Sequence, residues 1–224
     1  MEERALRRAL RRWGRRCYAR GLVAGTNGNL SVRIPGTGDI LITAAGSALG
    51  RLRPDDIVRV PINGLVAASA TVPVPGAEEA GDVPAGPRPS SELPLHRALY
   101  RAFAEIGAVV HTHSPAASAY ACAGRSIDLL SREAQVMLRV IPVVPFCQEG
   151  TEALAQEVVA TLSRAVRQEG LHPAKGGAAL LARHGVLTWG PDIAQAYYLA
   201  EVVEQVAQLG IYHRILGLFG RRSG

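Results

Sequence analysis

The stretch AVVHTHS, residues 108–114, places two histidines at the end of an apolar run. In a β-strand, alternate side chains point to the same face of the sheet. His111 and His113 are therefore expected to project side by side where a buried strand ends. Such a pair supplies two of the three protein ligands that are usual in a catalytic zinc site. The same pair is also typical of polar residues that simply close a strand, so both interpretations stay open at this point.

The chain before this strand is organised in hairpins. Residues 29–34 alternate apolar and polar side chains, and the segment DILITAAG, residues 39–46, predicts an antiparallel partner strand. A further strand pair is expected in residues 53–66. The segment 67–88 is rich in Ala, Pro and Gly and has no sustained period, so we predict a flexible insertion loop.

Helical patterns frame the hairpins and dominate the second half of the chain. Strands that form hairpins early and alternate with helices later predict a three-layer α/β or α+β domain with a mixed sheet. We expect residues 1–224 to form one such domain. Helices are predicted over 3–20, 90–106, 115–123, 150–170 and 192–216, and strand-like apolar runs over 140–146 and on both sides of Arg183-His184-Gly185.

Composition narrows the class of protein. The net charge of +6 could suggest a nucleic-acid ligand, but the excess lies at the chain ends and is not interleaved with aromatic residues. We therefore expect no nucleic-acid partner. No apolar run approaches the roughly 20 residues that span a bilayer, so no membrane association is expected. Three widely spaced cysteines are typical of reduced thiols, and we predict a cytoplasmic protein.

Two further positions carry metal-ligand or acid–base chemistry. His184, between two apolar runs, is a candidate third metal ligand from a distant loop. Glu92 follows Ser90 and Ser91 at the start of a predicted helix, where free N–H groups and the helix dipole suit a phosphate. The common alternative is that Ser90 or Ser91 merely caps the helix.

Two loops carry small polar residues and glycines. The first, GTNGN, contains Thr26, Gly28 and Asn29 before a strand, and the second, TAAGS, contains Thr43 and Gly46 after the next strand. Successive free N–H groups in such loops suit an anion. Neither has the lysine of a P-loop or the spacing of a dinucleotide fingerprint, and a tight turn is the simpler interpretation of each.

The order of these motifs is more informative than any one of them. Over about residues 5–210, the chain resembles the class II aldolase/adducin family, which includes L-fuculose-phosphate-type aldolases, L-ribulose-5-phosphate 4-epimerase and methylthioribulose-1-phosphate dehydratase. The resemblance implies a three-layer α/β/α fold with a central mixed, largely antiparallel sheet. It also implies a homotetramer with active sites between subunits.

The resemblance assigns a role to each motif. It implies a divalent metal, Zn²⁺ or another ion such as Mn²⁺ or Co²⁺, with Glu92 as a ligand and as the catalytic acid/base. The three histidine ligands would be His111, His113 and His184. The substrate phosphate would be held by Thr26, Gly28, Asn29, Thr43, Gly46, Ser90 and Ser91.

The implied activity is aldol cleavage of a phosphorylated ketose, such as L-fuculose 1-phosphate, to dihydroxyacetone phosphate and an aldehyde. The epimerases carry Asp where Glu92 stands, which disfavours that branch. The dehydratases share the look of RHGVLTWG and use a glutamate about twenty residues beyond the histidine pair, a place that Glu133 could take. Dehydration is therefore the alternative activity, and a non-catalytic adducin-like interaction module is the alternative outside enzymes.

Overall fold

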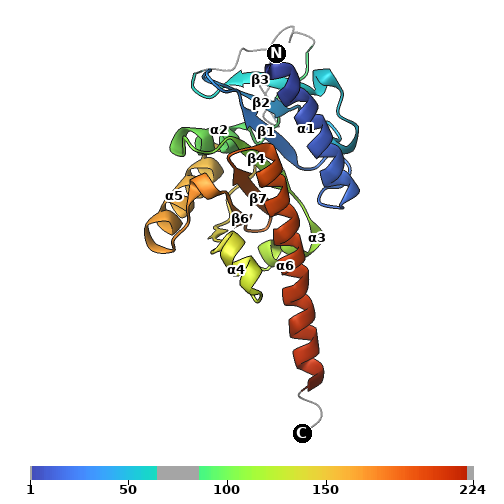
Figure 1. Cartoon of the computed structure of the whole chain (residues 1–224), viewed down its shortest axis with the longest axis vertical. Helices are drawn as coiled ribbons and strands as arrows, with labels where there is room; N and C mark the ends of the chain where they lie inside the picture. The colour runs from blue at the N-terminus through green and yellow to red at the C-terminus, as the bar shows by residue number, and fades with distance from the viewer. Residues whose placement is uncertain (1, 65–85, 221–224) are drawn as a thin grey trace.

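The computed structural model describes residues 2–64 and 86–220, and one seven-stranded sheet runs through it (Figure 1). The strand order is β3-β2-β1-β4-β7-β6-β5, and every neighbouring pair is antiparallel except β5 and β6. The strands are β1 (Asn29–Arg33), β2 (Asp39–Thr43), β3 (Ile57–Pro61), β4 (Ala108–Thr112), β5 (Val143–Val144), β6 (Gly177–Leu181) and β7 (Gly185–Gly190). The helices are α1 (Glu2–Ala19), α2 (Leu93–Ala102), α3 (Pro115–Cys122), α4 (Arg132–Leu138), α5 (Glu152–Gln168) and α6 (Ile193–Gly220).

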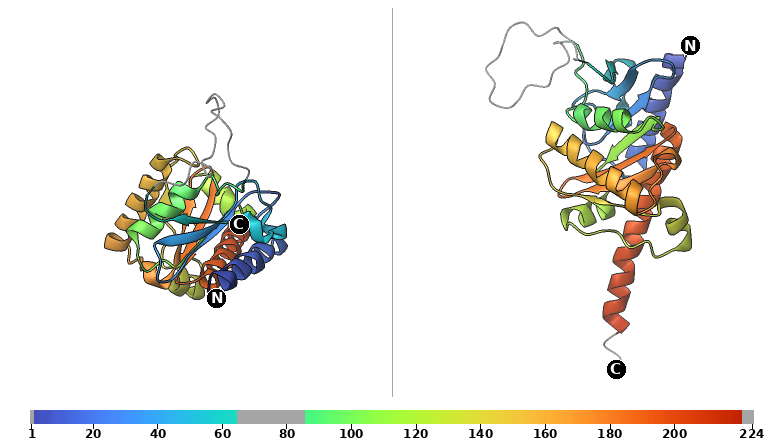
Figure 2. Two further views of the ribbon diagram at one scale, coloured as in Figure 1. Left: turned by 90° about the horizontal axis from the view of Figure 1, so that it is seen from above. Right: turned by 90° about the vertical axis from the view of Figure 1, so that its left-hand side faces the viewer.

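Helices cover both faces of the sheet (Figures 1 and 2). On one face α2 and α5 pack Leu99 and Val158 against sheet residues such as Val109. On the other face, α1 and α6 cover the β1 side of the sheet, and α3, α4 and α6 cover the β6 side. Burial of apolar side chains on both faces is the main favourable term in forming these layers. The predicted three-layer α/β/α architecture with a mixed, largely antiparallel sheet is confirmed.

The strand that leads into the histidine pair lies at the centre of the sheet. All five residues of β4 are buried, between β1 on one side and β7 on the other. Pairing with β1 places His111 opposite Asn29, and pairing with β7 places it opposite Leu187. Because β4 ends at Thr112 and runs antiparallel to β1, the histidine pair and the loop before β1 meet at the same end of these two strands.

Several local predictions need correction. The strand expected over 140–146 contains only Val143 and Val144, because the prolines on either side have no N–H to donate to a ladder. The short helix α4 was not predicted; it begins after Ser131, whose hydroxyl accepts the N–H of Ala134. Helix α2 begins at Leu93 with Glu92 as its N-cap residue, so neither serine is the cap, although Ser90 Oγ accepts the Glu92 N–H at 3.2 Å.

Two predictions fall largely outside the described residues. The strand expected after Asn63-Gly64 lies there, as does the predicted insertion loop 67–88 except for residues 86–88. Among the described helices, α6 is the longest, and its C-terminal turns extend beyond the other elements (Figures 1 and 2). Within residues 2–64 and 86–220, no helix combines the length and apolar character needed to cross a bilayer.

Candidate functional site

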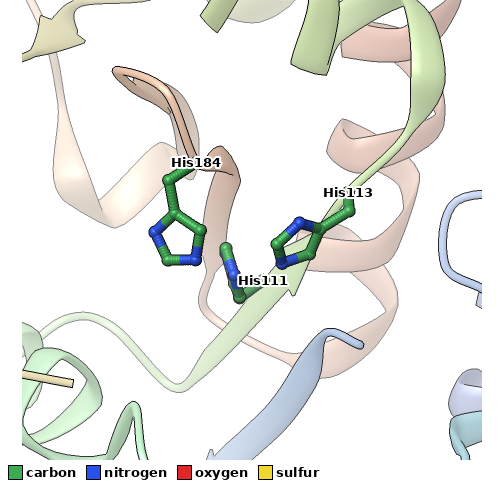
Figure 3. Close-up of side chains that lie close together, drawn as sticks. All are labelled: His111, His113 and His184. Carbon is green, nitrogen blue, oxygen red and sulfur yellow. The ribbon is translucent and has the colours of Figure 1, made fainter. Parts of the chain in front are cut away.

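Three histidines from two separated segments face one another at the C-terminal end of β4 (Figure 3). His111 lies near the end of β4, His113 follows directly after its last residue, and His184 comes from the turn between β6 and β7. The ring centroids of His111 lie 4.7 Å from those of both His113 and His184, and the last two lie 5.2 Å apart. One ligand nitrogen from each ring lies within 4.8 Å of the other two. The triad can therefore hold one metal ion.

The β6–β7 turn brings His184 to the strand end because of its backbone geometry. Arg183 adopts a left-handed conformation with φ of 59°, and the His184 N–H donates to the Leu181 carbonyl at 3.0 Å. A Cβ atom on Gly185 would lie 2.6 Å from the Thr112 carbonyl oxygen and 3.2 Å from the His111 ring. Only glycine leaves room for β7 to begin this close to the histidine pair.

The ring nitrogens of the triad have the state that metal ligation requires. His111 Nδ1 lies 2.9 Å from the Val186 carbonyl oxygen, which can only accept, so Nδ1 carries the proton. The lone pair of Nε2 then faces the triad. Burial lowers the pKa of all three imidazoles, for His113 to about 4, so the rings are neutral near pH 7. His111 Nε2 and His184 Nδ1 are buried without a hydrogen-bond partner among the described residues, so both are available to ligate a cation.

Glu92 adds a carboxylate to the same pocket. Its Oε1 accepts the Gly150 N–H at 3.1 Å, whereas Oε2 is buried without a partner among the described residues. Burial is the main reason why the pKa of Glu92 is raised to about 7; the Gly150 N–H opposes the shift, and the negative charge of Glu149 adds to it. Glu92 does not belong to the group of atoms within 4.8 Å. A carboxyl in this state can give or take a proton near neutral pH.

An open pocket of about 410 Å³ joins these groups to the predicted anion loops. Six of the seven predicted phosphate-binding residues line it together with the triad and Glu92. Gly28 has φ of 74°, and a Cβ there would lie 2.8 Å from the His111 carbonyl oxygen, so the loop can run close to β4 only with glycine. The six residues are Thr26, Gly28, Asn29, Gly46, Ser90 and Ser91.

Two predicted site residues do not line this pocket. Thr43 is buried and does not line the pocket; its hydroxyl oxygen accepts the Leu30 N–H at 3.1 Å and so joins β2 to β1. Glu133 lies on α4 and lines a separate pocket against α6, together with Val202 and Tyr212. Within one chain, the structure does not bring Glu133 to the histidines.

Two charged residues that were not predicted from the sequence also line the pocket. Arg183 supplies a permanent positive charge, and its guanidinium lies 4.7 Å from the centre of the Phe146 ring. Glu149 comes from the loop that also supplies the Gly150 N–H to Glu92. Arg183 could have been found from its place beside His184, whereas the sequence around Glu149 has no signal of a site.

The comparisons with known proteins agree with this geometry. Residues 8–211 match the family described as class II aldolase and adducin N-terminal domain. An L-fuculose phosphate aldolase of Methanococcus maripaludis is 30% identical over 200 residues, which are 89% of this chain and 92% of the relative. A methylthioribulose-1-phosphate dehydratase of Methylococcus capsulatus is 34% identical over 206 residues, 88% of each chain.

A solved structure gives the same result. The L-fuculose-1-phosphate aldolase of Thermus thermophilus superposes with a TM-score of 0.70 at 30% sequence identity, covering 98% of this chain and 97% of that one. The family match over residues 8–211 includes the seven strands of the sheet and all three histidines of the triad. This chain therefore belongs to the family of class II aldolase and adducin N-terminal domains.

Proposed function

We propose that this protein is a zinc-dependent class II aldolase that cleaves a phosphorylated ketose, such as L-fuculose 1-phosphate, to dihydroxyacetone phosphate and an aldehyde. The observation that carries the proposal is the triad of neutral histidines in one pocket with Glu92, in which His111 Nε2 and His184 Nδ1 are buried and have no partner in the described part of the chain. Three imidazoles and an open position are typical of catalytic zinc, and Mn²⁺ or Co²⁺ could take the same ligands.

The residues of the pocket divide into two groups. His111, His113 and His184 would hold the ion, with Glu92 Oε2 as a further oxygen donor. When bound, the metal supplies Lewis-acid stabilisation of the negative charge that develops on the ketose oxygens. The loops around Gly28 and Gly46 offer N–H groups to the substrate phosphate at the other end of the pocket.

Glu92 is the proposed proton carrier. Aldol cleavage removes a proton from the hydroxyl that becomes the aldehyde carbonyl and adds a proton to the carbon released from the broken bond. A carboxyl whose pKa is raised to about 7 has both protonation states available near neutral pH. Its hydrogen bond to the Gly150 N–H holds one oxygen in place and leaves the other for the reaction.

Dehydration of a methylthio-pentulose phosphate is the second candidate, which the 34% identity to a named dehydratase favours. That reading would make Glu133 the catalytic base. Glu133 lines a different pocket in the chain, whereas Glu92 lines the pocket of the triad. The non-catalytic adducin-like alternative is disfavoured because all three histidines are present and neutral, with His111 buried and the other two half-buried.

The test is an activity screen on the metal-loaded protein. We expect aldehyde release from L-fuculose 1-phosphate or L-ribulose 1-phosphate, its loss with a chelator, and its recovery with Zn²⁺, Mn²⁺ or Co²⁺. Glu92→Gln should abolish turnover while the metal content is retained, and Glu133→Gln is the matched control that should keep activity. Turnover that a chelator does not affect would contradict the metal mechanism. Water elimination that depends on Glu133 would replace aldol cleavage with dehydration.

We further propose a homotetramer with sites between subunits, acting in the cytoplasm. Exposed apolar side chains on α4 and α6, including Val136 and Leu216, support association. The three cysteines are all free thiols, which supports a reducing compartment.

A further inference from the structure

A row of buried polar side chains lies between β1 and α2, directly behind the pocket. Asn29 and Ser31 come from β1, and His96 and Tyr100 come from α2. His96 Nε2 lies 2.5 Å from Asn29 Oδ1, and His96 Nδ1 lies 2.6 Å from Ser31 Oγ. Ser31 Oγ lies 2.8 Å from the Tyr100 hydroxyl. These four side chains, here called the polar row, form a continuous chain of hydrogen bonds that ends at a residue lining the pocket.

Each hydroxyl and each neutral imidazole donates one proton along the polar row, so the row has two possible senses. In the first, Tyr100 donates to Ser31, Ser31 donates to His96 Nδ1, and His96 Nε2–H donates to Asn29 Oδ1. In the second, the Asn29 amide is turned over and its NH₂ group donates to His96 Nε2, His96 Nδ1–H donates to Ser31, and Ser31 donates to Tyr100. The Tyr100 hydroxyl proton then has no acceptor among the described residues, although the side chain is fully buried.

The first sense is the stable one, because a buried donor without an acceptor carries a free-energy cost. Burial also lowers the pKa of His96 to about 3, so the ring has a single proton near neutral pH. Ser31 donates to Nδ1 and thereby places that proton on Nε2. Arg33 closes the far end of the row, where its guanidinium lies 5.0 Å from the centre of the Tyr100 ring.

The consequence concerns Asn29, whose planar amide has nearly the same shape in either orientation. With Oδ1 bound to His96, the amide nitrogen is the group left to face the pocket. We infer that His96, held as its Nε2–H tautomer by Ser31, is a positioning residue that turns the NH₂ group of Asn29 toward the phosphate of the substrate. This inference rests on the proposed function only where it identifies the ligand as a phosphate.

The orientation matters because the two ends of an amide interact oppositely with an anion. The NH₂ end donates hydrogen bonds to phosphate oxygens, and bonds of this charge-assisted kind are stronger than neutral ones. The carbonyl end would repel the same oxygens. A free asparagine can present either end, whereas the polar row permits one.

The first test measures the tautomer directly and needs neither substrate nor turnover. In ¹⁵N NMR spectra of histidine-labelled protein near pH 7, the His96 ring should show a protonated Nε2 and an unprotonated Nδ1. His96→Gln identifies the His96 signals by their loss. A neutral ring protonated on Nδ1, or a charged ring, would overturn the inference whatever the enzyme's reaction is.

The second test measures the consequence for anion binding. Zinc-loaded protein is titrated with inorganic phosphate by calorimetry. We expect His96→Phe to raise the Kd about tenfold, the loss expected for one charge-assisted hydrogen bond. His96→Gln should recover most of the affinity, because its amide can donate to Asn29 and accept from Ser31.

Tyr100→Phe is the matched control in the same buried row. It removes a hydrogen bond but keeps the bond from Ser31 to His96, so the phosphate Kd should stay within about twofold of the wild-type value. An unchanged Kd in His96→Phe, or equal losses in His96→Phe and Tyr100→Phe, would overturn the inference. If His96→Phe does not fold, Ser31→Ala replaces it, since the loss of this donor releases the other tautomer. Absence of phosphate binding by the wild-type protein would contradict the proposed phosphate site, while the NMR result still decides the role of His96.

Discussion

At the residue scale, Glu92 has an unusual protonation state because it is buried. Only 4% of its surface is exposed, and burial is the largest cause of a pKa raised from 4.5 to about 7. In the unfolded chain the carboxyl returns to water and to its ordinary pKa. At pH values between the two pKa values, about 4.5 in the unfolded chain and about 7 in the folded protein, the folded protein binds more protons at Glu92 than the unfolded protein does.

This difference predicts how the stability of the metal-free protein depends on pH. The contribution of Glu92 is fully present below about pH 4.5 and is lost as the pH rises through about 7. At about 1.36 kcal/mol for each pKa unit, the loss amounts to roughly 2–3 kcal/mol between pH 5 and 8. Urea unfolding of metal-free wild-type protein and Glu92→Gln at both pH values measures it. The histidines are common to both proteins, so their effect cancels in the difference. An equal pH dependence in the two proteins would contradict the prediction.

The candidate metal ligands and the candidate phosphate-binding residues differed in how far the sequence predicted their positions. The side-by-side placement of His111 and His113 was predictable because alternate residues of an extended segment lie on one face, whereas their proposed role as ligands came from the family resemblance. Thr43 was assigned to the substrate phosphate, but its hydroxyl is used inside the sheet by the Leu30 N–H. The motif marks the loop, but only the packing around it decides whether a given hydroxyl faces the pocket or the core.

At the element scale, the turn between β6 and β7 determines whether the triad forms. The turn carries His184 to the end of β4, and β7 must begin against the Thr112 carbonyl. Two apolar runs around Arg183-His184-Gly185 were visible in the sequence. Their pairing as an antiparallel hairpin, with Leu181 opposite Gly185, became clear only in the sheet.

Gly185→Ala tests the closeness of this contact. A Cβ atom 2.6 Å from the Thr112 oxygen must push β7 away from β4. Overpacking of this kind typically costs about 1–3 kcal/mol, and we expect that loss in the free energy of unfolding together with a weaker affinity for zinc. Urea unfolding and competition with a zinc chelator give the two values.

Gly38→Ala is the matched control for this substitution. Its Cβ would have no heavy atom within 4 Å, so stability should change by less than about 0.5 kcal/mol and zinc affinity should be unchanged. If Gly185→Ala behaved like this control, the turn would be less constrained than its geometry indicates.

At the scale of the whole molecule, the longest described helix leaves apolar side chains in solvent. Tyr212, Leu216 and Leu218 on α6 are 60%, 69% and 69% exposed, and Val136 on the neighbouring helix α4 is 67% exposed. Exposed apolar side chains gathered on adjacent elements mark surfaces of association. A closed homo-oligomer would bury the same surface on each copy.

We therefore predict that the protein sediments as a homotetramer of 23.7 kDa chains. Replacing Leu216 and Val136 together by glutamate should lower the mass measured by light scattering, because charges would be buried at the interface. It should also lower turnover if the sites lie between subunits. Val166→Glu, on α5 at the opposite face of the sheet, is the control and should leave the mass unchanged. A wild-type monomer that is fully active would contradict both the tetramer and the shared site.

The sequence by itself indicated the layered fold and the glycine-rich loops, and its resemblance to a family indicated the candidate triad. The fold and the loops depend on short-range information: the period of two in strands, the spacing of apolar residues in helices, and the conformations open to glycine. The ordered set of motifs was enough to indicate the family, because a metal site needs several residues of fixed type in fixed places.

Only the tertiary structure decided which of the predicted residues share a pocket. Glu133 was separated from the triad, Arg183 and Glu149 were added to the pocket, and Asn29 was linked to a buried histidine on a distant helix. The physical reason is that burial, the loss of solvation and hydrogen-bond partners depend on residues far apart in the chain. These same long-range contacts raise the pKa of Glu92 and bury His111 Nε2 and His184 Nδ1 without a partner among residues 2–64 and 86–220.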